Sequence, residues 1–118
     1  MQAGLQMRLA LQQSDYFWAD IQKQVDWYRD KASPEVAERY IAAVEATLKE
    51  LAETPGSGRP RFQDWPELAG LHSWRVRKPY HRHLIFYRFD DKTLWAERVL
   101  HGARDLPRRL RQSPYEGE

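Results

Sequence analysis

Leu84-Ile-Phe-Tyr-Arg-Phe-Asp-Asp-Lys-Thr-Leu-Trp-Ala-Glu-Arg-Val-Leu-His-Gly-Ala-Arg-Asp105 is the stretch that decides the fold. It holds two runs rich in β-branched and aromatic residues, separated by Asp90-Asp91-Lys92. This pattern predicts a β-hairpin with an acidic turn. Gly102 then interrupts the second strand, so His101-Gly-Ala-Arg-Asp105 is expected to bring an imidazole and a guanidinium to one rim of a sheet.

Other strands are predicted on the N-terminal side of this hairpin. Met7–Leu11 alternates in polarity and is expected to form a short first strand. Leu71–Lys78 alternates too, with Trp74 and Val76 on an apolar face and Ser73, Arg75 and Arg77 on a cationic face. His83–Phe89 is apolar on both faces, which is typical of a central strand, and Thr93–His101 completes a three-stranded meander.

Two helices are predicted between the first strand and the meander. Ser14 is expected to cap a helix that runs from Asp15 to about Lys31. Ser33-Pro34-Glu35 begins a second helix, with serine as the cap and proline at the first helical position. Its apolar stripe comprises Ala37, Tyr40, Ile41, Val44, Leu48 and Leu51. The short connection between the helices favours an antiparallel αα-hairpin.

The stretch after the second helix is rich in helix breakers. Thr54-Pro-Gly-Ser-Gly-Arg-Pro60 is expected to end that helix, and Arg61–Gly70 to be irregular with a buried Trp65-Pro66 pair. The order β-α-α-β-β-β predicts an α+β domain in which a two-helix hairpin covers one face of a twisted antiparallel sheet of about four strands.

The length of 118 residues fits one domain with a core of its own. We expect residues 1–6 to be an unstructured start and residues 112–118 to be a flexible tail. Met1 and Met7 are both suitable initiation sites. Neither repeats nor linkers to a second domain interrupt the sequence.

The charges are unevenly distributed. The whole chain carries a formal net charge of +2, whereas residues 71–111 carry +7 and residues 1–70 carry −3. A basic sheet beside an acidic helical layer favours an anionic partner, either nucleic acid or an acidic peptide. The alternative is that these arginines and lysines form an ordinary solvated face.

Cysteine is absent from the sequence, which excludes disulfides, thiolate catalysis and cysteine-based zinc sites. This composition fits a reducing compartment, so we expect a cytoplasmic protein. The sequence has neither a signal peptide pattern nor the run of about 20 apolar residues that a membrane span needs. We expect no cofactor and no membrane association.

The two-helix hairpin, the Pro-Gly break, Ser73-Trp-Arg-Val76, Leu84-Ile-Phe-Tyr87 and Val99-Leu-His-Gly-Ala-Arg-Asp105 together resemble the ParE branch of the RelE/ParE toxin superfamily. The resemblance covers nearly the whole chain. It implies a growth-inhibiting toxin of a type II toxin–antitoxin module, of the kind linked to plasmid stabilization and neutralised by a cognate antitoxin. It also implies a homodimer or a heterotetramer with that antitoxin. ParE toxins are described as DNA gyrase inhibitors, whereas RelE-type relatives cleave mRNA on the ribosome.

The residues help to weigh these two activities. RNA cleavage needs a base, an acid and cations beside the phosphate, which His101 with Arg75, Arg77 and Arg98 could supply. However, RelE-type relatives place an aromatic residue after this histidine, where Gly102 stands here, and a lysine-rich helix is missing. Gyrase inhibition needs only a binding surface, so we favour it over ribosome-dependent endoribonuclease activity. A third hypothesis is an inactive orphan protein that binds only antitoxin.

For several residues, a structural interpretation stands beside a functional one. Arg104 and Asp105 could form a local ion pair or helix cap within the His101, Gly102, Arg104 and Asp105 motif. His81 and His83, two residues apart, could share a strand face, but the sequence offers them no further metal ligands, so we expect no metal site. We expect six aromatic residues to lie in the core: Trp18, Trp27, Tyr28, Trp74, Phe86 and Trp95. The candidates for contact with target or antitoxin are Arg75, Arg77, Lys78, Arg82, Arg104, Arg108 and Arg109.

Overall fold

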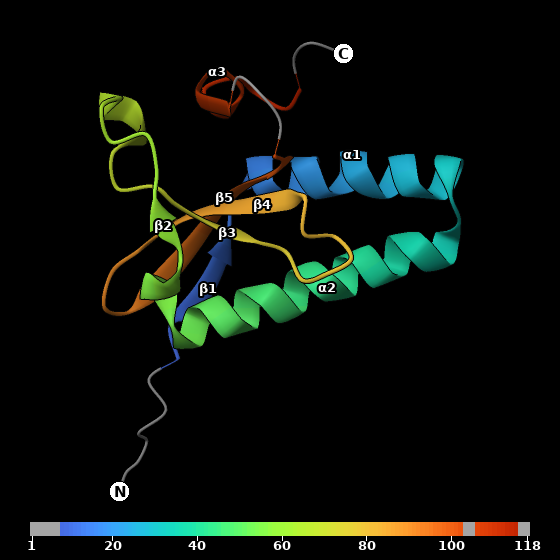
Figure 1. The fold of residues 1–118 in the computed structure, drawn as a ribbon, viewed down its shortest axis with the longest axis horizontal. Coiled ribbons are helices and arrows are strands. Elements are labelled where there is room, and N and C mark those ends of the chain that lie inside the picture. The colour runs from blue at the N-terminus through green and yellow to red at the C-terminus, as the bar shows by residue number, and fades with distance from the viewer. Residues whose placement is uncertain (1–7, 103–105, 116–118) are drawn as a thin grey trace, which may run out of the picture.

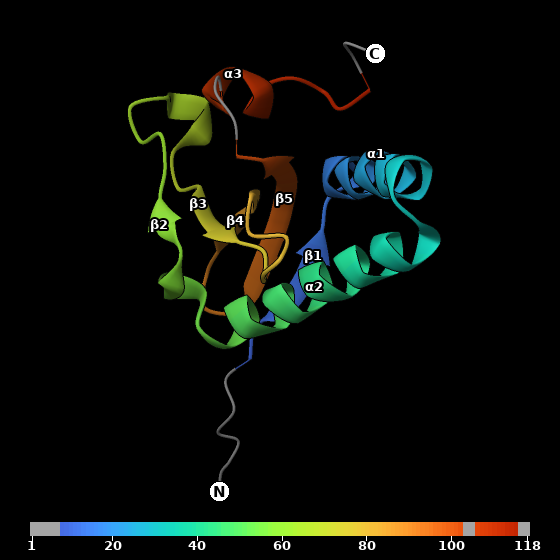
Figure 2. The same ribbon diagram turned by 45° about the vertical axis from the view of Figure 1, so that its right-hand side comes forward.

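A computed structural model describes residues 8–102 and 106–115 of the chain. The larger elements follow in the order β1 (Ala10–Gln13), α1 (Asp15–Lys31), α2 (Pro34–Glu53), β2 (Arg59–Pro60), β3 (His72–Arg75), β4 (His83–Phe89), β5 (Thr93–His101) and α3 (Leu106–Leu110). Two 3-10 turns lie on either side of β2, at Pro55–Ser57 and Pro66–Leu68. Figures 1 and 2 show α1 and α2 side by side on one face of the sheet, and α3 beyond the end of β5. The α+β class is therefore confirmed.

The sheet has five strands in the order β1-β5-β4-β3-β2. Because β1 pairs parallel with β5, the sheet is mixed, and the prediction of a purely antiparallel sheet of about four strands was wrong in this detail. The extra strand, β2, comes from Thr54–Pro60, the stretch that was expected to end the second helix. Arg59 pairs with Ser73 and Pro60 with His72, at an edge where the missing N–H of a proline does no harm.

The strands of the hairpin end where the sequence predicts, and β4 lies at the centre of the sheet. The other two predicted strands differ. β1 begins at Ala10, and Met7 lies outside the described residues. β3 ends at Arg75, and the chain turns two residues later, where the Tyr80 amide donates to the carbonyl of Arg77.

Both helices begin at the predicted serine caps. The Ser14 side chain accepts a hydrogen bond from the amide of Phe17, and that of Ser33 accepts from Val36. Each bond satisfies an amide that has no partner in the first helical turn. The two helices bury their apolar stripes against Ile85, Tyr87 and neighbouring side chains of the sheet.

Five tryptophans are more exposed than the sequence predicts. Trp18, Trp27, Trp65, Trp74 and Trp95 are exposed by 37 to 54%, although four were expected in the core and Trp65 in a buried pair. Trp18 follows the buried Phe17 directly, and adjacent helical residues point in directions about 100° apart, so only one of them can face the sheet. Phe86 is fully buried and Tyr28 half-buried.

The face of the sheet away from the helix hairpin has its own apolar cluster. Phe86 and Leu100 from the sheet pack there with Leu68, Leu71 and Leu106. The second 3-10 turn and α3 therefore cover part of this face, which explains why β4 is apolar on both sides. Among the described residues, no helix is both long enough and apolar enough to cross a membrane.

Candidate functional site

A pocket of about 690 Å³ opens at the β2 side of the sheet. We call it the arginine pocket; Glu50, Arg59, Arg61, Ser73, Trp74, Arg75, Arg77, Leu84, Gly102 and Leu106 form its wall. β2 reaches only as far as Ser73, so among the described strands Trp74 and Arg75 lie at an open edge of β3. The pocket thus forms because β2 is two residues long.

The four arginines of this pocket differ in their partners. Arg61 donates from Nη1 to the Ser73 hydroxyl at 3.2 Å, and Arg77 forms an ion pair with Glu50 at 2.8 Å. Arg59 and Arg75 are exposed and have no hydrogen bond or ion pair within the described part of the chain. Their guanidinium groups are therefore available to an anionic ligand.

The pKa directions reflect these surroundings. Burial, and then the nearby charge of Arg59, lower the pKa of Arg61, while the hydrogen bond with Glu50 raises that of Arg77. Both groups stay charged at neutral pH, because an arginine side chain in a protein does not deprotonate in that range. The described residues of the pocket wall include no histidine and one carboxylate, which is already paired. Their charge favours the binding of an anion.

His101 faces a different recess, which we call the histidine groove. This groove measures about 500 Å³ and is lined by Lys23, Gln24, Trp27, Tyr28, Pro79, Tyr80, Arg82, His83 and His101. His101 is exposed, and its ring centre is 5.4 Å from that of His83. The Nε2 atom of His83 lies 3.1 Å from the Tyr28 hydroxyl. Burial, together with the proximity of His101, lowers the pKa of His83 to about 4, so His83 is neutral at pH 7.

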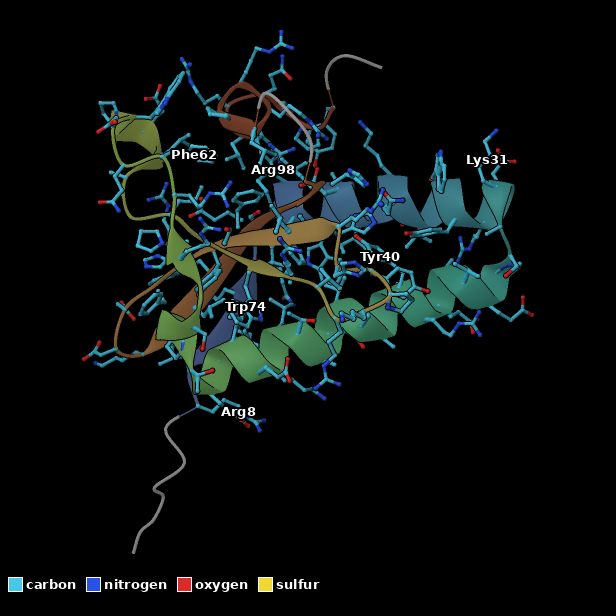
Figure 3. All side chains as sticks on the ribbon, in the orientation of Figure 1. Arg8, Lys31, Tyr40, Phe62, Trp74 and Arg98 are labelled. Atoms are coloured by element: carbon cyan, nitrogen blue, oxygen red, sulfur yellow. The ribbon has the colours of Figure 1, made fainter. Side chains whose placement is uncertain are left out.

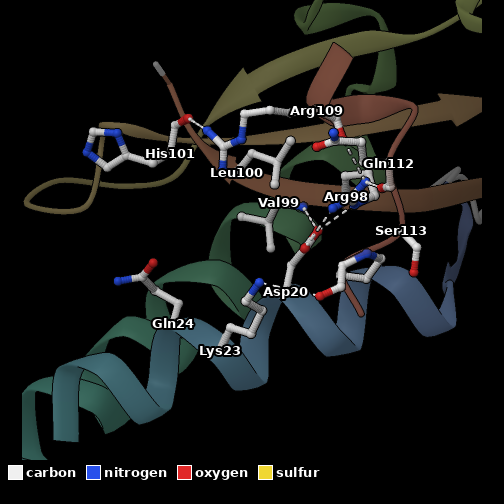
Figure 4. Close-up of a pocket in the computed structure, with 11 residues that line it drawn as sticks. Asp20, Lys23, Gln24, Arg98, Val99, Leu100, His101, Arg109, Gln112 and Ser113 are labelled. Carbon is white, nitrogen blue, oxygen red and sulfur yellow. Dashed lines mark hydrogen bonds and ion pairs between the residues drawn. The ribbon is translucent and has the colours of Figure 1, made fainter. Parts of the chain in front are cut away.

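A third recess adjoins the histidine groove and contains a buried ion pair (Figure 4). Arg98 donates to both carboxylate oxygens of Asp20, at 2.7 and 3.0 Å, and each residue is less than 10% exposed. The guanidinium also donates to the carbonyl oxygens of Arg109 and Gln112. Arg98 thus links β5, α1 and the C-terminal segment, and these contacts are structural.

The predicted nuclease residues are consequently divided between two places. Arg75 and Arg77 line the arginine pocket, whereas His101 and Arg98 both line the recess of Figure 4, where Arg98 is buried and paired with Asp20. Figure 3 shows Arg98 on the α1 side of the sheet and Trp74 towards β3. None of the described recesses brings all four groups to one phosphate.

The other predicted contact residues are placed as follows. Lys78 is exposed in the turn after β3, and Arg82 lines the histidine groove. Arg108 and Arg109 belong to α3, where Arg109 donates to the carbonyl of His101. Gly102 lines the arginine pocket, whereas Arg104 and Asp105 lie outside the described residues.

Two histidines predicted to share a strand face do not do so. His81 lies in the turn before β4, because that strand begins at His83. His83 points into the core and contacts Tyr28 and Tyr40. In residues 8–102 and 106–115, no group of three or more potential ligands lies close enough to hold a metal ion.

Two residues of the predicted tail, Gln112 and Pro114, contact the rest of the fold. The Gln112 carbonyl accepts from Arg98, the Pro114 carbonyl accepts from Lys23, and Pro114 is buried. The sequence analysis also missed Arg59 and Arg61, since Arg59 falls in the stretch expected to end the second helix and Arg61 in the stretch expected to be irregular. Their alternation directly after Gly58 is the signal that could have identified a second cationic edge.

Comparisons with known proteins agree with this fold. A family model described as the ParE toxin of type II toxin–antitoxin systems, parDE, matches residues 11–106. A structure of the chromosomal ParDE TA system from P. aeruginosa has a TM-score of 0.66 and 18% identity, and the match covers 82% of this chain and 99% of the other. For the toxin–antitoxin complex RelBE2 from Mycobacterium tuberculosis, the TM-score is 0.55 and the identity 24%, with coverages of 80% and 92%. No curated protein matches the sequence.

Proposed function

The chain belongs to the ParE toxin family of type II toxin–antitoxin systems, and from this premise we propose that it inhibits DNA gyrase by binding and is neutralised by a cognate antitoxin. The observation that carries the proposal is the arginine pocket. It gathers four guanidinium groups and an exposed indole, yet its described wall offers no group suited to take up a proton at neutral pH. Such a surface suits inhibition by binding.

An antitoxin partner has independent support. The solved structures that resemble this chain are described as a ParDE toxin–antitoxin system and a RelBE2 toxin–antitoxin complex. In this chain, exposed aromatic side chains on α1, among them Trp18 and Trp27, offer apolar anchor sites for such a partner. A homodimer or a heterotetramer with antitoxin remains part of the proposal, as does action in the cytoplasm.

A second candidate function is ribosome-dependent mRNA cleavage. One observation favours it: His101 is exposed in a groove that also contains Lys23 and Arg82. An imidazole beside two cations can support phosphoryl transfer. The separation of His101 from Arg75 and Arg77 counts against this alternative. An inactive orphan that binds only antitoxin is the third candidate.

Parallel assays of purified protein separate these functions. We expect the chain to inhibit DNA supercoiling by gyrase and to leave mRNA on translating ribosomes intact. The double variant Arg59→Glu/Arg75→Glu should weaken inhibition by about tenfold or more, since charge reversal repels an anionic partner. Arg29→Ala, which removes an exposed arginine of α1 outside the arginine pocket, is the matched control.

Each alternative has its own readout. Full supercoiling activity in the presence of excess toxin would exclude gyrase inhibition. Cleavage of mRNA that disappears in His101→Ala would replace it with the nuclease function. A chain that inhibits neither process, and whose expression leaves growth unchanged, would be the orphan.

A further inference from the structure

The wall of the arginine pocket is rich in hydrogen-bond donors and poor in acceptors. Four arginines and the indole N–H of Trp74 are donors. The acceptors among the wall side chains are already engaged, because Glu50 accepts from Arg77 and Ser73 accepts from Arg61. A ligand that fits this wall must offer acceptors with little need for donors in return.

The charge of the pocket leads to the same conclusion. Its four guanidinium groups and single carboxylate leave three positive charges in the described wall. Arg59 and Arg75 have no ionic partner among the described residues, so a ligand would not have to displace an existing contact to reach them. All four cations are arginines, whose planar forks match phosphate groups in two-point contacts.

Three of the arginines share one face at the edge of the sheet. The hydrogen bond from the Arg61 amide to the Leu71 carbonyl continues the ladder just beyond β2. Residues two apart along an extended chain lie about 6–7 Å from each other on one face. Arg59 and Arg61 thus form one row, and Arg75 lies on the same face, two residues after Ser73, the partner of Arg59. Arg77 stands apart, because its guanidinium is paired with Glu50 of α2. A row of cations suits a polymer with regularly repeated negative charges.

Trp74 adds an aromatic surface to this pocket. Its side chain is 39% exposed. The core beneath the helices is filled by Ile85, Val76 and other buried residues, and Trp74 is not part of it. An exposed aromatic ring beside arginines is the usual combination for single-stranded nucleic acids, in which bases stack while cations follow the backbone.

From these four observations, we infer that the arginine pocket binds single-stranded nucleic acid, with the arginines on the phosphates and Trp74 stacked on a base. An acidic peptide is the competing ligand, but its backbone carries one N–H donor for almost every carbonyl acceptor. Apart from main-chain carbonyls at the open edge of β3, the wall has few free acceptors for those donors, whereas a phosphodiester backbone presents acceptors only. This inference goes beyond gyrase inhibition, which does not require the toxin itself to hold nucleic acid.

Fluorescence anisotropy with labelled oligothymidylate and oligouridylate of 12 nucleotides tests the inference with the purified chain. Contacts with three phosphates predict that affinity falls by about 20-fold between roughly 50 and 200 mM salt. Trp74→Ala and Arg75→Glu should each weaken binding by about tenfold, while Trp74→Phe should retain most of it. Arg29→Ala, with its arginine on α1, should bind like the unchanged protein.

Three results would overturn the inference: no measurable binding at low salt, an equal loss of affinity in Arg29→Ala, or tighter binding of poly-glutamate than of either oligonucleotide. The last result would identify an acidic peptide as the occupant. Thermal unfolding of each variant excludes loss of fold as the cause of weaker binding. Because the assay contains no gyrase, its outcome is separate from that of the supercoiling assay.

Discussion

Arg98 connects three segments of the fold, namely β5, α1 and the C-terminal segment. Its guanidinium neutralises Asp20 and holds the carbonyls of Arg109 and Gln112, while the Val99 amide donates to the same Asp20 carboxylate. β1 pairs with β5 only as far as Ala96. Beyond that point, the Asp20 carboxylate accepts the hydrogen bond of the Val99 amide in place of a neighbouring strand. A side chain thus completes the edge of the sheet.

We expect removal of either partner to be costly. Arg98→Met leaves the Asp20 charge buried, and Asp20→Ala leaves the guanidinium buried, so each should lower the free energy of unfolding by about 3–5 kcal/mol. The double variant should lose less than the sum of the two, because no unpaired charge remains. Urea unfolding of the four proteins measures this, and additive losses would contradict the assignment.

His83 makes stability depend on pH. Its pKa in the folded protein is about 4, against an ordinary value of 6.5. Between these values the unfolded chain binds a proton that the folded protein does not, so the free energy of unfolding must fall as the pH is lowered. The loss should begin near pH 6.5 and reach roughly 3 kcal/mol by pH 4.

A variant without the imidazole isolates this effect. His83→Gln should be less stable than the unchanged protein at pH 7, and the difference should shrink as the pH approaches 4. Urea unfolding at pH 7, 5.5 and 4.5 measures both proteins. A constant difference across that range would show that His83 titrates normally in the folded chain.

At the scale of elements, the turn into β2 depends on the absence of a side chain at Gly58. The Gly58 amide donates to the Tyr87 hydroxyl at 3.0 Å, and that hydroxyl donates to the Pro55 carbonyl. A Cβ atom at this position would clash with the Tyr87 hydroxyl and approach the Ser73 carbonyl oxygen to 2.8 Å. Close packing thus fixes the strand that carries Arg59.

Gly58→Ala should therefore lower the free energy of unfolding by about 1–3 kcal/mol, through forced displacement of β2 or Tyr87. Gly56→Ala is the matched control two residues earlier, because a Cβ there would have no atom within 4 Å. Its effect should stay within about 0.5 kcal/mol. Thermal or urea unfolding distinguishes the pair, and equal effects would show that the Tyr87 contact is not limiting.

The elements that the sequence predicted well have strong local signals. Serine caps and apolar periodicity placed α1 and α2, and the acidic turn placed β4 and β5. β2 has no such signal, since Arg59-Pro60 becomes a strand only through pairing with β3. The parallel pairing of β1 likewise depends on contacts with residues more than 80 positions away. Propensity alone cannot reveal such long-range pairing.

The candidate site could likewise be predicted only in part from the sequence. Arg75 and Arg77 were identified from their alternation on a strand. However, Arg75 pairs with Leu84 and His101 with His83, so Arg75 and His101 face opposite sides of the sheet. Arg98 looked like one more cation of a basic strand, although it is 6% exposed and paired with Asp20. Its partner lies 78 positions earlier in the chain, so the sequence gives no local indication of the pair.

For the whole molecule, the division of charge follows its layers. The region of +7 charge corresponds to β3, β4, β5 and α3, whereas α1 and α2 contain most of the acidic residues. Ion pairs between the layers, such as Arg77–Glu50, are half-exposed and contribute little to stability. The division matters more for the encounter with an anionic partner, which a positive field accelerates at low salt.

The position of β1 also has a consequence for synthesis. β1 comes first in the chain, yet within the described sheet its neighbour is β5, which comes last. As the ribosome makes the protein, Ala10–Gln13 has no strand to join until Thr93–His101 has left the exit tunnel. Native structure that relies on such distant contacts forms late and slowly. A nascent chain interrupted before residue 93 would therefore be unable to complete its sheet.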